Sequence, residues 1–168
     1  MNNDSIKKLF LLAAITYAKS GNHVWYISCF PFEKIPNNII IPEKEVLSLI
    51  TFVFLKDYKD LINHLNGIHL WRKPPRIILV AGFEEYSNLN KPDYNPMCAA
   101  LISTSLLDAI STAAAKLNAV SYLIVACRIL ENYKSRLNIL RMLYFSEIIS
   151  HPKEQDMLNA IMKTLEIR

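Results

Sequence analysis

Four continuous apolar runs alternate with segments of helical character along this chain. The runs are HVWYISCF at 23–30, LITFVFL at 49–55, RIILVA at 76–81 and AVSYLIVAC at 119–127. Solid apolar runs are typical of strands that are buried on both faces of a parallel sheet. Helices between such strands supply the crossovers that parallel pairing requires. We therefore predict an α/β fold over residues 1–168, a single domain with a mostly parallel sheet between two helical layers.

Capping and turn residues bound the helices expected between these strands. The predicted helices are about 4–20, 57–66 and 96–117. Gly21 and Gly67 are stop signals, Asp57 is an N-cap residue, and Pro96 suits the first turn of a helix. These signals place the helices before the first strand, after the second and after the third.

The remaining segments have weaker signals. We expect a loop with a short helical turn at 31–45, a polar loop at 82–95, a basic loop and helix at 128–141, and a fifth strand at 143–150. In the tail, 153–166, the residues Met157, Ile161 and Leu165 form one helical stripe, although its end also fits an edge strand.

Composition limits the classes of function. The net charge of +4 permits a polyanionic partner but is far below that of a dedicated nucleic-acid protein. The cysteines Cys29, Cys98 and Cys127 are expected to be buried free thiols in a reducing compartment, and no metal-ligand spacing is present. Lys7 and Lys8 before LFLLAAITYA imitate a secretory signal, but we expect a helix of the domain there. No apolar run reaches the about 20 residues that span a membrane, so we expect no membrane contact.

Glycine is too scarce for a phosphate-binding loop. The chain has three glycines, at 21, 67 and 82, and they stand alone, so neither GxxxxGK[ST] nor GxGxxG is present. Without clustered backbone amides at the start of a helix, a triphosphate has no cradle.

Two groups of polar residues are candidates for a site. Glu84 and Glu85 follow the third strand, where they are either an acid/base pair at the ligand-binding edge of the sheet or the solvated start of a loop, the reading we favour. Cations with a nearby aromatic, Tyr133, follow the fourth strand and suit phosphate contact, or are an ordinary solvated face. These cations are Arg128, Lys134, Arg136 and Arg141.

The order of the elements resembles a RecA-type core that starts just after its phosphate loop. Within that superfamily the chain is similar to the RecA-like subunit of the Shu complex that associates with a SWIM-domain protein. The similar stretches are KKLFLLAAITYAKSGNHVWYISCFPFEKIP (7–36), ITFVFLKDYKDLINHL (50–65), RIILVAGFEEY (76–86), ALISTSLLDAISTAAAKL (100–117) and LRMLYFSEIIS (140–150).

The resemblance also shows where this chain departs from an ATPase. The strand that reads roughly YIDTE in RecA-type proteins reads YISCF here, with Ser28 and Phe30 at the positions of the acids. The Mg²⁺-associated strand ends in Ala81 where the Walker B aspartate would stand, and Walker A is absent. The resemblance therefore implies a degenerate nucleotide site, no catalysis and no cofactor.

The resemblance further implies a nuclear factor of homologous recombination and DNA repair, active in meiosis. Its partners would be a zinc-binding SWIM-domain protein, in a heterodimer, a RecA-type recombinase, and DNA contacted through the complex. In RecA folds the loops after the Mg²⁺-associated strand and after the next core strand hold DNA, and here they are 87–95 and 128–136. The candidate DNA-binding residues are Lys91, Arg128, Lys134, Arg136 and Arg141. The alternatives are a small α/β enzyme with its site at 82–95, or a scaffold that contacts protein alone.

Overall fold

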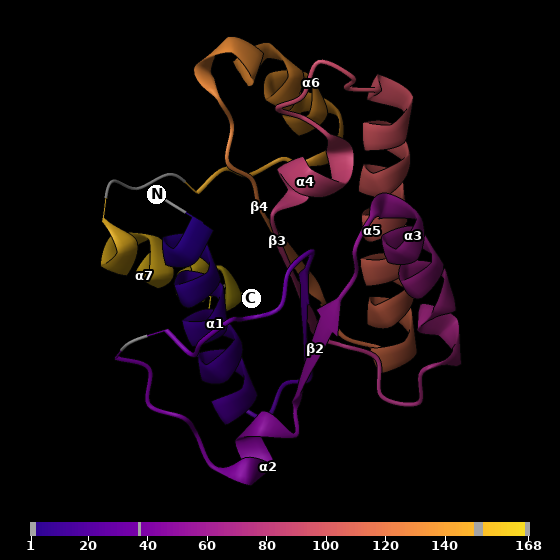
Figure 1. Ribbon diagram of the computed structural model, residues 1–168. Coiled ribbons are helices and arrows are strands. Elements are labelled where there is room, and N and C mark those ends of the chain that lie inside the picture. Colours follow the sequence, from indigo (N-terminus) through magenta and orange to yellow (C-terminus); the bar gives the residue numbers. More distant parts are fainter. Residues whose placement is uncertain (1–2, 37, 150–152, 167–168) are drawn as a thin grey trace.

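A single sheet of four parallel strands forms the centre of the molecule (Figure 1). The computed structural model of the chain describes residues 3–36, 38–149 and 153–166. The strands are β1 (Val24–Ser28), β2 (Ile50–Phe54), β3 (Ile77–Ala81) and β4 (Tyr122–Ala126), in the spatial order β2–β1–β3–β4. The predicted α/β fold is confirmed, and this sheet is wholly parallel.

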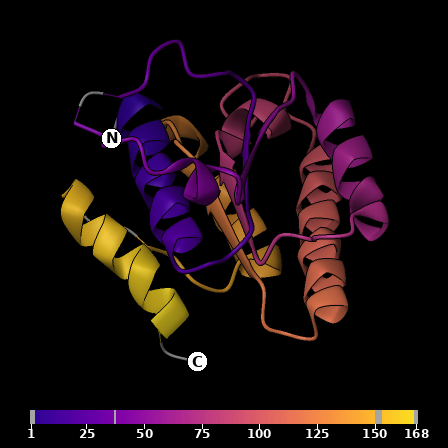
Figure 2. The ribbon, with the colours of Figure 1, turned by 90° about the horizontal axis from the view of Figure 1, so that it is seen from below.

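Helices cover both faces of the sheet (Figures 1 and 2). One face carries α1 (Asn3–Lys19) and α7 (Glu154–Glu166), and the other carries α3 (Tyr58–Asn66) and α5 (Pro96–Leu117). The shorter elements are α2 (Lys44–Leu47), η1 (Gly67–Leu70), α4 (Phe83–Ser87), η2 (Glu131–Tyr133) and α6 (Lys134–Tyr144).

Alternation along the strands divides the apolar side chains between two cores. Trp25 and Ile27 of β1 belong to the core on the α3 and α5 side, whereas Val24 and Tyr26 belong to the core on the α1 and α7 side. Every residue of β1 and β3 is buried. Burial on both faces explains why these strands are solid apolar runs in the sequence.

The strand order creates a switch point between β1 and β3. The chain leaves β1 along the α1 side, where Phe32 and Val46 pack, and reaches β2 at one edge of the sheet. It leaves β3 toward the other side and reaches β4 through α5 at the opposite edge. The loops after β1 and β3 therefore diverge, and ligands of open α/β sheets bind at such a point.

The predicted helix boundaries are confirmed where capping residues set them. The Asp57 carboxylate accepts hydrogen bonds from the backbone N–H of Lys59 and Asp60, at 2.9 and 3.0 Å, and α3 begins at the next residue. The long helix runs from Pro96 to Leu117, as predicted, with its first turn capped by the Asn95 side chain.

The predicted fifth strand at 143–150 is wrong over the residues that the structure describes. Residues 143 and 144 end α6, and 145–149 form neither helix nor strand, while residue 150 lies outside the described residues. Phe145 packs against the core on the α5 side and Ile149 against the core on the α1 side. The segment therefore passes from one face of the sheet to the other instead of joining its edge.

Two other predictions are refined by the structure. The polar loop predicted at 82–95 begins with the helix α4, because Phe83, Tyr86 and Leu89 are buried in the core. The tail is the helix α7, with the Ile161 side chain buried against the α1 side and Met157 partly buried there. The side chain of Leu165 lies outside the described residues.

The helix α5 differs from the expectation about membrane spans. Its length and composition are those of a helix able to cross a bilayer, although the sequence led us to expect no such segment. In this fold one side of α5 packs on the sheet, with Ile102, Leu106 and Ala113 fully buried. The same properties belong to the core helix of an α/β domain, so they do not indicate a membrane protein.

Candidate functional site

A small hollow lies at the switch point, between the carboxyl ends of β1 and β3. It is lined by Ile6, Lys7, Ser28, Cys29, Phe30, Ala81, Gly82, Glu84 and Glu85. Its cavity volume is about 30 Å³. A water molecule needs roughly 10–15 Å³ on this measure, whereas small-molecule sites usually measure about 300 Å³ or more. The volume of the hollow corresponds to at most about two or three waters and is far below that of a nucleotide site.

Ser28, Phe30 and Ala81, the positions that the sequence analysis expects to be a degenerate nucleotide site, all line this hollow. Ser28 and Ala81 are direct partners in the parallel register of β1 and β3. The Ser28 hydroxyl donates a hydrogen bond of 3.1 Å to the Phe30 carbonyl oxygen, and Ala81 has no polar side-chain atom. Lys7 lies over the exposed Phe30 ring, with Nζ 5.9 Å from the ring centroid. None of these three side chains is a carboxylate that could hold a metal ion.

Glu84 is buried, so the favoured reading of it as the solvated start of a loop is wrong. Its side chain is 4% exposed, and Oε2 accepts a hydrogen bond of 3.1 Å from the backbone N–H of Arg128. Burial raises the pKa of this carboxyl above its usual value. Burial, together with the nearby Glu84 carboxyl, raises the pKa of the Cys127 thiol. Glu84 thus connects the end of β3 to the end of β4, while Glu85 is only partly buried.

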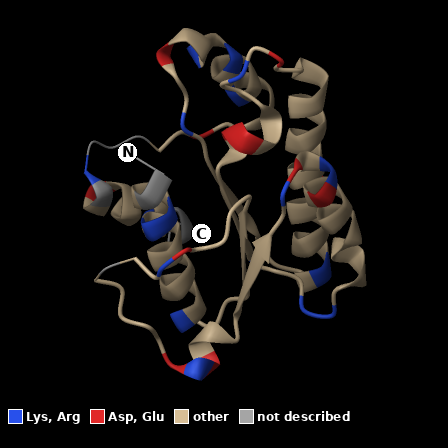
Figure 3. Ribbon diagram, viewed as in Figure 1, with Lys and Arg blue, Asp and Glu red and all other residues tan. Residues whose placement is uncertain are grey.

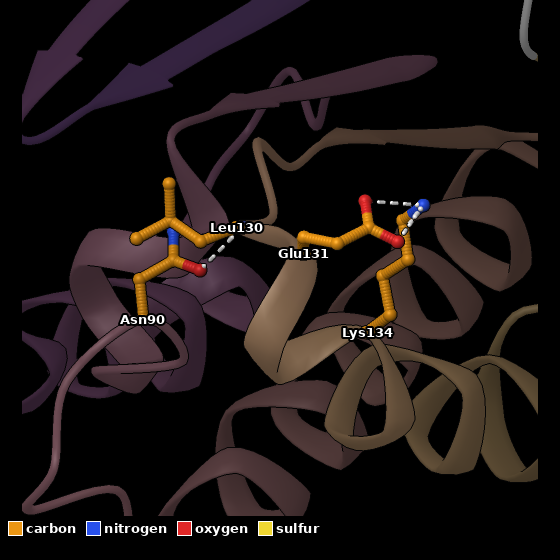
Figure 4. Close-up of polar contacts among 4 residues, drawn as sticks. All are labelled: Asn90, Leu130, Glu131 and Lys134. Carbon is orange, nitrogen blue, oxygen red and sulfur yellow. Dashed lines mark hydrogen bonds and ion pairs between the residues drawn. The ribbon is translucent and has the colours of Figure 1, made fainter.

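Asn90 makes a second connection between the same two loops. Its Nδ2 donates a hydrogen bond of 2.7 Å to the Arg128 carbonyl oxygen. Its Oδ1 accepts a hydrogen bond of 2.9 Å from the Leu130 N–H, which Figure 4 shows. Both polar ends of the amide are used on the backbone of the facing loop. The loop after β3 is therefore bound to the loop after β4.

Arg136 makes the third connection. Its Nη1 donates to the carbonyl oxygens of Leu89 and Lys91, at 2.9 and 2.7 Å. Its guanidinium carbon lies 4.7 Å from the ring centroid of Tyr94 and 4.2 Å from that of Tyr133. The sequence offered this cation as a DNA contact, and the structure gives it a role in holding α6 against the loop after β3. The two Nη1 donors of Arg136 are consequently unavailable to phosphate.

The other candidate cations belong to the segments that follow β3 and β4, and Figure 3 shows several Lys and Arg residues on the part of the ribbon that contains α6. Lys134 pairs with Glu131 at 2.7 Å, and both side chains are exposed (Figure 4). Such a surface pair contributes little and is readily exchanged for another anion. The residues Lys91, Arg128 and Arg141 are exposed, and no hydrogen bond or ion pair within 3–36, 38–149 and 153–166 engages their side chains. We call these three residues the carboxyl-edge cations.

Metal and thiol chemistry have little basis in the described part of the chain. That part contains no group of three or more His, Cys, Asp or Glu side chains able to hold a metal ion. The three cysteines are free thiols, of which Cys29 is buried and Cys98 and Cys127 are partly buried. Burial raises the pKa of Cys29 to about 11, so its reactive thiolate form is scarce at neutral pH.

The hydrogen bonds that join the loops after β3 and β4 were not predicted from the sequence. No pattern marks Asn90 as a bridge, because its two partners are backbone groups about forty residues away. The burial of Glu84 could have been predicted from its neighbours. Phe83 and Tyr86 have the spacing of the apolar side of a helix, which places the carboxylate between them close to the core.

The molecule is thus an α/β protein with a four-stranded parallel sheet. The carboxyl ends of its two central strands, β1 and β3, enclose only a small hollow. The loops after β3 and β4 carry exposed cations. No protein-family model and no curated protein matches the sequence.

Proposed function

We propose that this chain is a non-catalytic RecA-like subunit that binds DNA, within a complex, in homologous recombination. The observation that carries the proposal is the small hollow between β1 and β3, where Ser28 and Ala81 stand in register and neither side chain is a carboxylate. A RecA-type site needs its two carboxylate strands side by side. Here β1 and β3 are adjacent and end in Ser28 and Ala81, neither of which is a carboxylate.

DNA contact is supported by the position of the two loops that RecA-type folds use for it. The loop after β3 and the loop after β4 are joined through Asn90 and Arg136 into one surface. Around it lie the carboxyl-edge cations, exposed and available for phosphate. Phosphate contacts by lysine and arginine supply most of the affinity of non-specific binding.

The proposed setting follows from the resemblance to Shu-type subunits. The partner is a zinc-binding SWIM-domain protein in a heterodimer, and the complex supports the assembly of recombinase filaments in the nucleus, in meiosis among other settings. A subunit that binds DNA and protein without hydrolysing ATP fits such a role. Support of a recombinase filament requires contacts from this chain and no ATP hydrolysis by it.

The enzyme alternative has one favourable feature, the raised pKa of the buried Glu84 carboxyl at a switch point. Its geometry is less favourable, because Oε2 is engaged by the Arg128 N–H and the adjacent hollow, at about 30 Å³, is far smaller than a usual substrate site. We therefore assign Glu84 to positioning of the loops.

Equilibrium dialysis with radiolabelled ATP and Mg²⁺, at high protein concentration, tests the non-catalytic claim. We expect no saturable binding. A micromolar affinity for ATP would contradict the non-catalytic claim. The hollow would then have to open into a nucleotide site without carboxylates at positions 28 and 81. A related ATP-binding protein with an intact phosphate loop serves as the positive control.

A further inference from the structure

The outer edge of β4 presents unpaired backbone groups. The Tyr122 N–H donates to the Arg76 carbonyl oxygen at 2.8 Å, so the backbone groups of Tyr122 face β3. Backbone groups alternate in direction along a parallel strand, and those of Leu123 and Val125 therefore face away from the sheet. No backbone group among the described residues pairs with them on that side.

The sequence of β4 is unlike that of a protected edge strand. The run SYLIVAC at 121–127 contains no charge, proline or glycine, which are the usual means of blocking a sheet edge. All five residues of β4 remain partly exposed, whereas all five of its neighbour β3 are buried. The other edge strand, β2, has buried and exposed residues along its length, with Phe52 and Phe54 exposed. β4 thus has an interior sequence in an edge position.

Positive charge lies at both ends of this edge. At its start, Arg76 Nε donates a hydrogen bond of 3.3 Å to the Val120 carbonyl oxygen, and at its end Arg128 is exposed. The segment 118–130 contains no Asp or Glu. A second copy pairing antiparallel through β4 would bring Arg76 of one chain close to Arg128 of the other, which is repulsive. A strand with acidic ends would instead be attracted.

We propose that the β4 edge binds an extended segment of another protein, which adds a fifth strand to the sheet. The segment pairs with the backbone groups of Leu123 and Val125 and carries acidic residues at both ends, beside Arg76 and Arg128. This inference rests on the proposed role as a binding subunit and adds the surface and the chemistry of the partner segment.

A synthetic peptide tests this edge directly. The probe is a fluorescent peptide of alternating Val and Thr with two Asp at each end, and its binding is followed by fluorescence anisotropy. Two further peptides serve as comparisons: one N-methylated at alternate residues, which cannot pair, and one with Lys in place of Asp. We expect saturable binding of the acidic peptide, and dissociation constants at least about tenfold higher for both comparison peptides.

The matched protein variants are Val125→Pro and Phe52→Pro. Proline at 125 removes an N–H that faces outward from β4, and proline at 52 does the same at β2, because β2 turns its Leu49 and Thr51 groups toward β1. Val125→Pro should weaken the acidic peptide at least about tenfold, and Phe52→Pro should leave its affinity unchanged. Should Val125→Pro fail to fold, hydrogen exchange in the unmodified protein decides: the peptide must protect the amides of Leu123 and Val125.

Three results would overturn the proposal: no saturable binding of the acidic peptide, equal binding of the Lys peptide, or dimerisation of the chain that Val125→Pro abolishes in sedimentation. DNA affinity is measured separately. Absence of DNA binding with intact peptide binding would contradict the proposed function and support the proposal for the β4 edge. DNA binding without peptide binding would support the proposed function and contradict the proposal for the β4 edge.

Discussion

The Arg136 guanidinium donates a hydrogen bond of 2.7 Å to the carbonyl oxygen of Lys91. These two residues belong to the two loops that the sequence nominated for DNA contact, and the bond joins the loops. One of the two cations therefore positions the other: Arg136 orders the backbone from which the exposed Lys91 side chain projects.

Replacing Arg136 should destabilise the fold even when its charge is kept. Arg136→Lys loses the planar group that lies between Tyr94 and Tyr133 and bonds two carbonyl oxygens. We expect the free energy of unfolding in urea to fall by about 1–3 kcal/mol. Arg141→Lys, on the exposed side of α6, is the matched control and should change it by less than about 0.5 kcal/mol. Equal stability of the two variants would contradict the stabilising role of the Arg136 contacts.

Glu84→Gln should change how stability depends on pH. The folded carboxyl has a raised pKa, so the folded state holds its proton at a pH where the unfolded chain has lost it. Stability is then lost as pH rises from the ordinary value of 4.5 through the folded pKa. The amide of Gln keeps an oxygen for the Arg128 N–H and has no charge to bury, so this loss should disappear. Urea unfolding from pH 4 to 8 measures the difference, and Glu85→Gln, which should keep the loss, is the control.

His64 should make the fold sensitive to acid. Its ring lies 4.6 Å from the ring centroid of Trp25 and 5.9 Å from that of Trp71, and burial lowers its pKa below the ordinary 6.5. A lowered folded pKa gives stability that is complete above pH 6.5 and is lost as pH falls through the folded value. In His64→Phe the loss over this range should be smaller, as followed by tryptophan fluorescence in urea. His69→Phe, at an exposed position, should leave the profile unchanged.

Asn90 should control the order of the edge without affecting the core. Asn90→Ala removes the acceptor for the Leu130 N–H and the donor to the Arg128 carbonyl oxygen. We expect the Leu130 amide to exchange with solvent at least about tenfold faster, while the amides of β3 keep their protection. Asn138→Ala on the exposed side of α6 should change neither. Unaltered exchange at Leu130 would mean that the two loops hold together without Asn90.

The sequence predicted helices and strands well where the signal did not depend on residues distant in the sequence. Asp57 and Pro96 set helix starts through their own backbone chemistry, and the apolar runs of β1 and β3 reflect burial on both faces. The segment at 143–150 misled the prediction because an apolar stretch that crosses between two cores has the composition of a strand. Its course depends on where α6 and α7 pack, which no local pattern encodes.

The location of the candidate site could be predicted from the sequence, but the hydrogen bonds and ring contacts of its residues could not. The loops after β3 and β4 could be assigned from strand order, since parallel strands end at one edge. The roles within them depend on long-range partners: Arg136 and Arg128 are equivalent cations in the sequence, yet one binds backbone and rings while the other is exposed. Burial of Glu84 is likewise a consequence of β4 lying beside it.

The salt dependence of DNA binding tests the central claim most directly. The measurement is the affinity for a fluorescent single-stranded oligonucleotide from 50 to 300 mM salt, with the chain and whatever complex it forms on purification. Lys91, Arg128 and Arg141 are replaced together by Gln, and the matched control replaces Lys19, Lys44 and Arg72, three exposed cations that precede the amino ends of β1, β2 and β3. The account predicts that the first variant binds more weakly and that its slope of log affinity against log salt shrinks by about 2, while the control keeps the native slope. Equal slopes for the two variants, or native affinity in the first, would contradict it.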